Sequence, residues 1–175
     1  VRMFPLKSEH ILPLVSLDLL PLPARHLLNM PLYMNTKSTH SGVKRWPVGT
    51  IMSSRGCPSN CNFCAIRTLW GKGFRMRSVQ NVLGEILHLI DNYGIKELHF
   101  EDDCFTANKK RAMGILNAII AFKSFDKRWD LTLNSPSGLA VFAMDEELMD
   151  KMKEAGYYSL SFAIESGSQH VLKDL

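Results

Sequence analysis

From residue 48 onward, the apolar and polar positions alternate between the two-residue period of strands and the longer period of helices. Strands are predicted over residues 48–54, 95–101, 130–134 and 157–165. Helices are predicted over residues 79–90, 113–120, 148–155 and 169–175. Ser78 and Asp145 are placed to cap two of these helices, while Gly94 and Gly156 are placed to end them. Repeated strand–helix alternation predicts parallel strands joined by right-handed crossovers.

The predicted strands have one apolar and one polar face. A parallel strand covered by helices on both sides is apolar throughout. In the second strand, however, Leu98 and Phe100 alternate with His99 and Glu101. In the last strand, the residues assigned to the helix side are Tyr158, Leu160, Phe162 and Ile164. This pattern predicts an α/β fold, a partial parallel (β/α) barrel with a polar interior, truncated after about four β/α units.

Residues 1–47 show no sustained period and are rich in proline. Residues 20–23 are expected to be extended, because each proline disfavours helix in the residue before it. Several apolar residues lie within positions 27–34, so this segment is interpreted as a linker or an arm that packs across a neighbour. The barrel unit is then predicted to occupy residues 48–175.

Composition narrows the class of protein. The chain has 175 residues, of which 46% are apolar and 22% charged, as in an ordinary soluble globular domain. The net charge of +4 is spread out, so no nucleic-acid partner is expected, and no apolar run is long enough to span a bilayer.

Clustered cysteines without a secretory signal predict a reducing, cytoplasmic environment rather than disulfides. The chain starts at Val1 and stops inside a helical pattern, so it is interpreted as a fragment.

The strongest chemical signal is a group of three cysteines after the first predicted strand. Cys57 and Cys61 are separated by three residues, and Cys61 and Cys64 by two. Three thiolates on one short loop can converge on a single metal centre and leave one coordination position open. An iron without a protein ligand at that position can bind a substrate or a cofactor.

Polar residues also follow each of the other predicted strands. They occupy residues 101–103, 134–135 and 165–168. In barrels of parallel strands the chemistry collects at the carboxyl ends of the strands. These residues and the cysteine loop are therefore expected to meet at one rim.

The cysteine spacing, set between a strand and a helix, resembles that of the radical SAM superfamily, and Phe63 matches the aromatic residue usual before the last cysteine. The resemblance implies a [4Fe–4S] cluster on Cys57, Cys61 and Cys64, with S-adenosylmethionine (SAM) at the open iron. It further implies reductive cleavage of SAM to a 5′-deoxyadenosyl radical, an external flavodoxin- or ferredoxin-like electron donor and a small-molecule substrate.

Further stretches are similar to the subgroup of this superfamily that carries a cobalamin-binding domain. They are residues 77–78, 94–103, 151–156 and 164–168. Residues 20–25 resemble the linker between the two domains, which implies cobalamin bound by a domain outside this chain. Radical modification or methylation of the substrate follows from that resemblance.

The family's cofactor contacts can be placed on this sequence by position. Glu101 and Asp102 fall where an acidic or glycine-rich motif holds the methionyl amino group, and the alternative is that these acidic residues only solvate the end of a strand. Glu165 falls where the family contacts the ribose or methionyl part of SAM, and Asn134 is a similar candidate. His99 is interpreted as buried and hydrogen-bonded, and Cys104 as a packed free thiol.

Two other functions remain open at this point. One is a methylthiotransferase-like modifier of nucleic acid from the same superfamily, which requires a further cluster domain and an RNA-binding module. The other is a non-catalytic zinc-binding interaction module built on the three cysteines and a histidine. Structural zinc loops favour paired cysteine spacings, which the present motif lacks.

Overall fold

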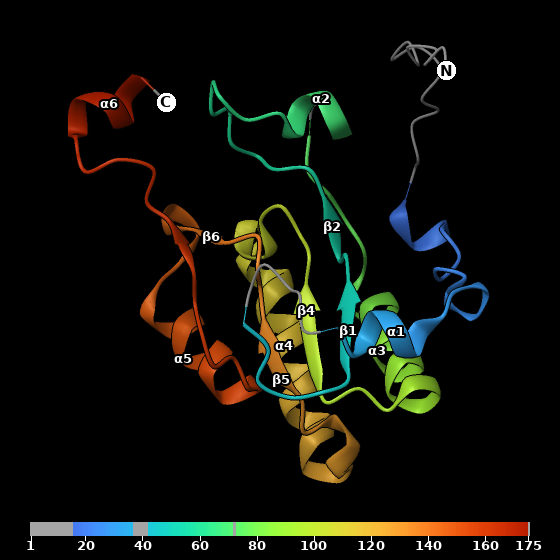
Figure 1. The fold of residues 1–175 in the computed structure, drawn as a ribbon. Coiled ribbons are helices and arrows are strands. Elements are labelled where there is room, and N and C mark those ends of the chain that lie inside the picture. The colour runs from blue at the N-terminus through green and yellow to red at the C-terminus, as the bar shows by residue number, and fades with distance from the viewer. Residues whose placement is uncertain (1–15, 37–41, 72, 175) are drawn as a thin grey trace, which may run out of the picture.

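The computed structural model describes residues 16–36, 42–71 and 73–174. Three parallel strands form its central sheet in the order β1 (Val48–Ile51), β4 (Glu97–Phe100), β5 (Thr132–Asn134). The long helices α3 (Val79–Tyr93), α4 (Lys109–Phe125) and α5 (Glu146–Ala155) lie along this sheet (Figure 1). The predicted parallel α/β fold is therefore confirmed.

The hydrophobic core lies between the sheet and these helices. Leu98 and Phe100 of β4 are fully buried against Ile86 of α3, Ile115 of α4 and Met152 of α5. The other elements are short: α2 (Ile66–Trp70), α6 (Gln169–Asp174), η4 (Phe105–Ala107), η5 (Lys127–Trp129) and η6 (Val141–Ala143). Among the described residues, no helix is both long enough and apolar enough to cross a membrane.

The predicted ends of two helices agree with the structure. The Ser78 hydroxyl accepts a hydrogen bond from the Asn81 amide at the start of α3, and the helix ends at Gly94, which is left-handed. Asp145 caps α5 in the same way, and Gly156 follows its last residue with φ 117°. A Cβ at Gly156 would lie 2.5 Å from the Leu131 carbonyl oxygen, so this close approach of α5 to the sheet requires glycine.

The first predicted strand is in fact two elements. After β1 the chain leaves the sheet, and β2 (Ser54–Arg55) pairs antiparallel with β3 (Arg75–Met76). This two-stranded ribbon encloses the cysteine loop and projects beyond the carboxyl ends of the sheet (Figure 1). The change of partner occurs where Ser53 and Ser54 bond to Asp102 instead of continuing the β1–β4 ladder.

The prediction for the fourth strand is wrong in both length and facing. Only β7 (Phe162–Ala163) is a strand, and it pairs with β6 (Leu139–Ala140). Tyr157, not Tyr158, packs in the core, with its ring 6.5 Å from that of Phe100. Ile164 is 67% exposed, and the helix that follows it, α6, contributes no buried residue.

The polar face of the sheet is confirmed, but in β4 it is filled by protein. Glu97 and His99 are buried there, with the Glu97 carboxylate 2.6 Å from His99 Nε2. The same carboxylate accepts hydrogen bonds from the Lys44 and Arg45 amides and from the hydroxyls of Thr132 and Tyr158. His99 is therefore buried and hydrogen-bonded, as predicted from the sequence.

The described part of the arm runs beside β1 and α3 (Figure 1). It contains η2 (Leu17–Leu19), η3 (Arg25–Leu27) and α1 (Met30–Met34). Leu17, Arg25 and Met34 are buried in this position. The rest of the predicted arm, residues 1–15 and 37–41, lies outside the described residues.

Candidate functional site

The root of the cysteine loop is fixed by contacts with the end of β4. The Gly56 amide donates a hydrogen bond to Asp103 Oδ2, at 2.9 Å. Gly56 has φ 84°, and a Cβ there would lie 2.4 Å from the Gly73 carbonyl oxygen across the ribbon. Only glycine therefore suits the position immediately before Cys57.

Asp102, which was predicted to contact the cofactor, lies in an internal hydrogen-bonded cluster. Its side chain is buried, and its carboxylate accepts hydrogen bonds from the Ser53 amide, the Ser53 hydroxyl and the Ser54 hydroxyl. Arg111 donates to the carbonyl and hydroxyl oxygens of Ser53 and so completes the cluster. Asp102 thus holds the start of the ribbon, and it has no exposed oxygen to offer a ligand.

Burial raises the pKa of Asp102, while the hydrogen bonds from Ser54 and Ser53 and the charge of Arg111 oppose that rise. Burial lowers the pKa of Arg111, because for a basic group too it disfavours the charged form. A charged group inside a protein is tolerated when it is paired and hydrogen-bonded. The position of β2 relative to β4 thus depends on this internal polar cluster.

The cysteines that are expected to bind a cluster lie beyond this fixed root. Cys57 and Cys61 are half-buried, Cys64 is exposed, and all three are free thiols. The described residues contain no group of three cysteine, histidine or acidic side chains close enough to share a metal ion. The cysteine spacing predicts that the three sulfurs converge, and in this structure they do not.

The physical reason is local. Between β2 and α2 the loop has neither helix nor strand, and its one internal backbone hydrogen bond among these residues joins Cys64 N to Cys61 O, at 3.2 Å. Thiols are weak hydrogen-bonding groups, so contacts among them do not gather the three side chains. As metal ligands, three free cysteines suit iron once they are deprotonated, because Fe–S proteins bind iron through cysteine thiolates.

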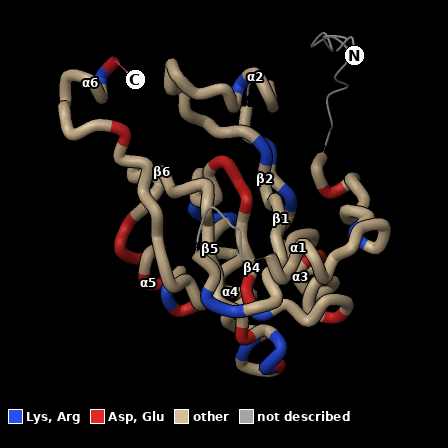
Figure 2. The backbone as a smooth tube through the Cα atoms, viewed as in Figure 1, with Lys and Arg blue, Asp and Glu red and all other residues tan. Residues whose placement is uncertain are grey.

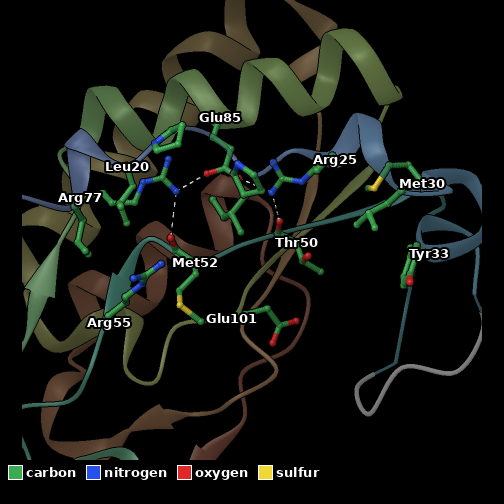
Figure 3. A pocket seen from close by; sticks show the side chains of 15 residues that line it. Leu20, Arg25, Met30, Tyr33, Thr50, Met52, Arg55, Arg77, Glu85 and Glu101 are labelled. Carbon is green, nitrogen blue, oxygen red and sulfur yellow. Dashed lines mark hydrogen bonds and ion pairs between the residues drawn. The ribbon is translucent and has the colours of Figure 1, made fainter. Parts of the chain in front are cut away.

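Glu101 lies at a cavity of about 440 Å³ between the arm and the end of the sheet (Figure 3). Its amide donates to the Ile51 carbonyl oxygen at 2.8 Å, which continues the β1–β4 pairing for one more residue. Arg55, Thr50 and Met52 line the same cavity. In Figure 2 the acidic end of β4 lies beside the basic ribbon.

The remaining predicted residues are not gathered with Glu101. Asn134 is buried, donates to the Tyr158 hydroxyl and accepts from the Ser135 amide, so it belongs to the polar network on the sheet rather than to a ligand site. Glu165 is exposed after β7 with φ 62°. Phe63 is 56% exposed on the cysteine loop. Cys104 is buried, as expected for a packed thiol, and burial raises its pKa.

A buried ion cluster that also lines this cavity was not predicted from the sequence. Glu85 of α3 is paired with both Arg25 of the arm and Arg77 next to the ribbon (Figure 3). A signal was present in the sequence. Glu85 follows Val82 by three residues and directly precedes Ile86, which places a carboxylate on the apolar stripe of the helix.

Comparison with known proteins supports the resemblance of the cysteine loop to the radical SAM superfamily. A model of the radical SAM superfamily matches residues 51–175, which include the whole cysteine loop. This chain belongs to the radical SAM superfamily. The resemblance inferred from the cysteine spacing is therefore confirmed at the level of the family.

Among curated proteins, the chain is 42% identical to cytidylyl-2-hydroxyethylphosphonate methyltransferase of Streptomyces wedmorensis, over 91% of this chain and 29% of that protein. It is 28% identical to hopanoid C-2 methylase of Rhodopseudomonas palustris, over 83% of this chain and 27% of that protein. The chain thus spans less than a third of the length of these two relatives.

The fold resembles that of TsrM from Kitasatospora setae, a radical SAM methyltransferase. With tryptophan and a SAM analogue bound, TsrM matches 71% of this chain and 23% of its own, with a TM-score of 0.62 and 23% identity. With cobalamin and a [4Fe–4S] cluster bound, it matches 63% of this chain and 19% of its own, with a TM-score of 0.54 and 26% identity.

Proposed function

We propose that this chain is the cluster-binding part of a radical SAM methyltransferase of the cobalamin-associated type, acting on a small molecule. The observation that carries the proposal is the cysteine loop itself. Three free thiols follow a root that Asp102 and Asp103 fix to the end of a parallel sheet. The family match and the curated methyltransferase relatives support it.

In this proposal Cys57, Cys61 and Cys64 hold a [4Fe–4S] cluster as thiolates. When bound, such a cluster would supply the electron for reductive cleavage of SAM to methionine and a 5′-deoxyadenosyl radical, and an external flavodoxin- or ferredoxin-like protein would provide that electron. Gly56 and Asp103 fix where the first ligand begins. The remainder of the loop adapts to the cluster, because no ladder of hydrogen bonds restrains it.

Glu101 remains our candidate for the methionyl amino group of SAM, because its carboxylate lines a cavity and the hydrogen bonds of the sheet involve only its backbone. Phe63 and Glu165 remain candidates for further contacts to SAM. Asp102 is reassigned to the support of the ribbon, and Asn134 to the network around Glu97. Both therefore act by positioning rather than by touching a ligand.

The methyl acceptor is proposed to be a small molecule, as in the relatives named after methylation of cytidylyl-2-hydroxyethylphosphonate and of a hopanoid. Cobalamin would be held by a part of the protein outside this chain, by analogy with TsrM, whose structure contains it. The four free cysteines suit a reducing compartment, so we assign the protein to the cytoplasm.

Anaerobic reconstitution tests the proposal directly. The intact protein should take up about four irons per chain and absorb broadly in the visible range. Cys61→Ala should lose both properties, whereas Cys104→Ala should keep them, because Cys104 is buried outside the loop. With SAM labelled in its methyl group, label should then appear in a small product. A colourless protein that holds one zinc would refute the proposal in favour of the zinc-binding module.

A further inference from the structure

Glu85 uses both of its carboxylate oxygens to join two segments that are distant in sequence. Its Oε1 accepts from Arg25 Nη2 and its Oε2 accepts from Arg77 Nη1 (Figure 3). The Glu85 side chain is 1% exposed, and those of Arg25 and Arg77 are 9% and 11% exposed. This is a buried ion cluster of one carboxylate and two guanidinium groups rather than a surface pair, so loss of one partner leaves buried polar atoms without a hydrogen-bond partner.

On one side of the cluster lies the arm. Arg25 Nη2 also donates to the Thr50 carbonyl oxygen at 3.0 Å, on the open edge of β1. A second arm residue, Asp18, accepts a hydrogen bond at 2.8 Å from the amide of Ser78, the residue after Arg77. The arm is therefore attached to α3 through two of its residues, Arg25 and Asp18, and both attachments lie next to Arg77.

On the other side lies the ribbon that carries the cysteine loop. Arg77 directly follows β3, and its amide donates to the Ser53 carbonyl oxygen at 3.0 Å. Its Nη1 donates to the Met52 carbonyl oxygen at 3.2 Å. Arg77, which follows the cysteine loop in sequence, thus holds residues 52–53, which precede it.

We propose that Glu85 is a positioning residue that couples the seating of the arm to the order of the cysteine loop. When Arg25 leaves, Glu85 Oε1 becomes a buried acceptor without its donor, at a large cost. The planar fork of Arg77 can serve both oxygens of one carboxylate, and it does so by giving up the Met52 carbonyl. The ribbon then loses a constraint that it has only when the arm is seated.

This inference deepens the proposed function, on which its consequence for the cluster rests. Whatever moves or replaces the arm would change how firmly the three thiols are presented to iron. The coupling itself concerns only the protein, so it can be measured in the cluster-free state. A failure of the coupling and a failure of the proposed function are therefore distinguishable.

The decisive variant is Arg25→Met in the intact, cluster-free protein, because Arg25 hydrogen-bonds to Glu85 and Thr50 and to no residue of the ribbon. Hydrogen–deuterium exchange should become about tenfold faster at the Arg77 amide and at the amides of β2 and β3. Alkylation of half-buried Cys57 should accelerate, while buried Cys104 should stay protected and so report an intact core.

Two variants control this experiment. Asp91→Asn removes another acidic residue of α3, paired with Arg128 at 2.6 Å, and should leave ribbon exchange unchanged. Arg25→Lys keeps the charge and should restore much of the protection. The proposal is overturned if Arg25→Met speeds exchange in residues 17–28 but not in the ribbon, since Arg25 would then only anchor the arm.

If Arg25→Met exposes Cys104 and is therefore unfolded, Asp18→Asn provides a milder release of the arm. It weakens the bond to Ser78 without removing a partner of buried Glu85. Faster exchange at both the arm and the ribbon would support the coupling. Faster exchange at the arm alone would refute it.

Discussion

Asp103 holds Gly56 by a hydrogen bond of 2.9 Å from the Gly56 amide to Asp103 Oδ2. The carboxyl end of β4 is thereby joined to the residue before the first cysteine. A carboxylate that accepts from a backbone amide makes one of the stronger hydrogen bonds in proteins. The position of the first thiol thus depends on a neighbouring strand and not only on its own loop.

Asp103→Ala should weaken retention of the cluster. The Gly56 amide loses its acceptor, and a hydrogen bond to a charged group contributes about 1.5–3 kcal/mol. We expect a chelator to remove iron from the reconstituted variant roughly tenfold faster, since about 1.4 kcal/mol corresponds to that factor. Asp150→Ala on the exposed side of α5 is the matched control. Equal rates for the two variants would contradict this role of Asp103.

Gly56→Ala should destabilise the fold. The added Cβ would meet the Gly73 carbonyl oxygen at 2.4 Å, and φ is 84°. We expect the free energy of unfolding in urea to fall by about 1–3 kcal/mol. Gly84→Ala is a matched control on α3, where an added Cβ meets nothing within 4 Å, and it should stabilise the helix by about 0.5–1 kcal/mol. Tolerance of alanine at position 56 would show that the turn is not as constrained as described.

Glu101→Gln and Asp102→Asn should separate ligand binding from support. Glu101 lines the cavity, so Glu101→Gln should weaken SAM binding to the reconstituted protein about tenfold or more while iron content stays normal.

Asp102→Asn should lower the free energy of unfolding by about 1–3 kcal/mol, because Asn supplies one acceptor oxygen for three donors. Its folded fraction should bind SAM normally. The reverse pattern would restore Asp102 as the cofactor residue.

Local features of this fold were predictable from the sequence, because they depend on neighbours in the chain. Ser78, Gly94, Asp145 and Gly156 mark helix ends through contacts within a few residues. The parallel sheet followed from strand–helix alternation. The β2–β3 pairing was not predictable in this way, since it joins two-residue strands about twenty residues apart through a loop without a period.

Two site residues show how strand parity decides such predictions. Asp102 follows Glu101, and successive side chains on a strand face opposite sides. Asp102 therefore falls on the side that faces the helices, with Leu98 and Phe100. Parity therefore favoured a buried role for Asp102 that resemblance to the family did not reveal. The Glu85 cluster is different, because no pattern within one element shows which arginines approach a buried carboxylate.

The network around Glu97 predicts a specific dependence of stability on pH. Burial alone would raise the pKa of Glu97, but hydrogen bonds from His99, the Arg45 and Lys44 amides and Thr132 lower it below its usual value. A carboxyl group whose pKa is lower in the folded state stabilises the fold above its unfolded pKa. That stabilisation is lost as pH falls through the folded value.

The free energy of unfolding should therefore decline as the pH falls below about 4.5, the ordinary pKa of this group. Glu97→Gln should be less stable than the parent at pH 7 by about 1–3 kcal/mol, because its neutral amide accepts at one oxygen only. The difference should shrink as the parent's Glu97 becomes protonated. Asp145→Asn, at an exposed ion pair, controls for the acid response of surface carboxylates. Urea titrations from pH 7 to pH 3.5 measure both, and a difference for Glu97→Gln that stays constant would show that ionised Glu97 contributes nothing to the fold.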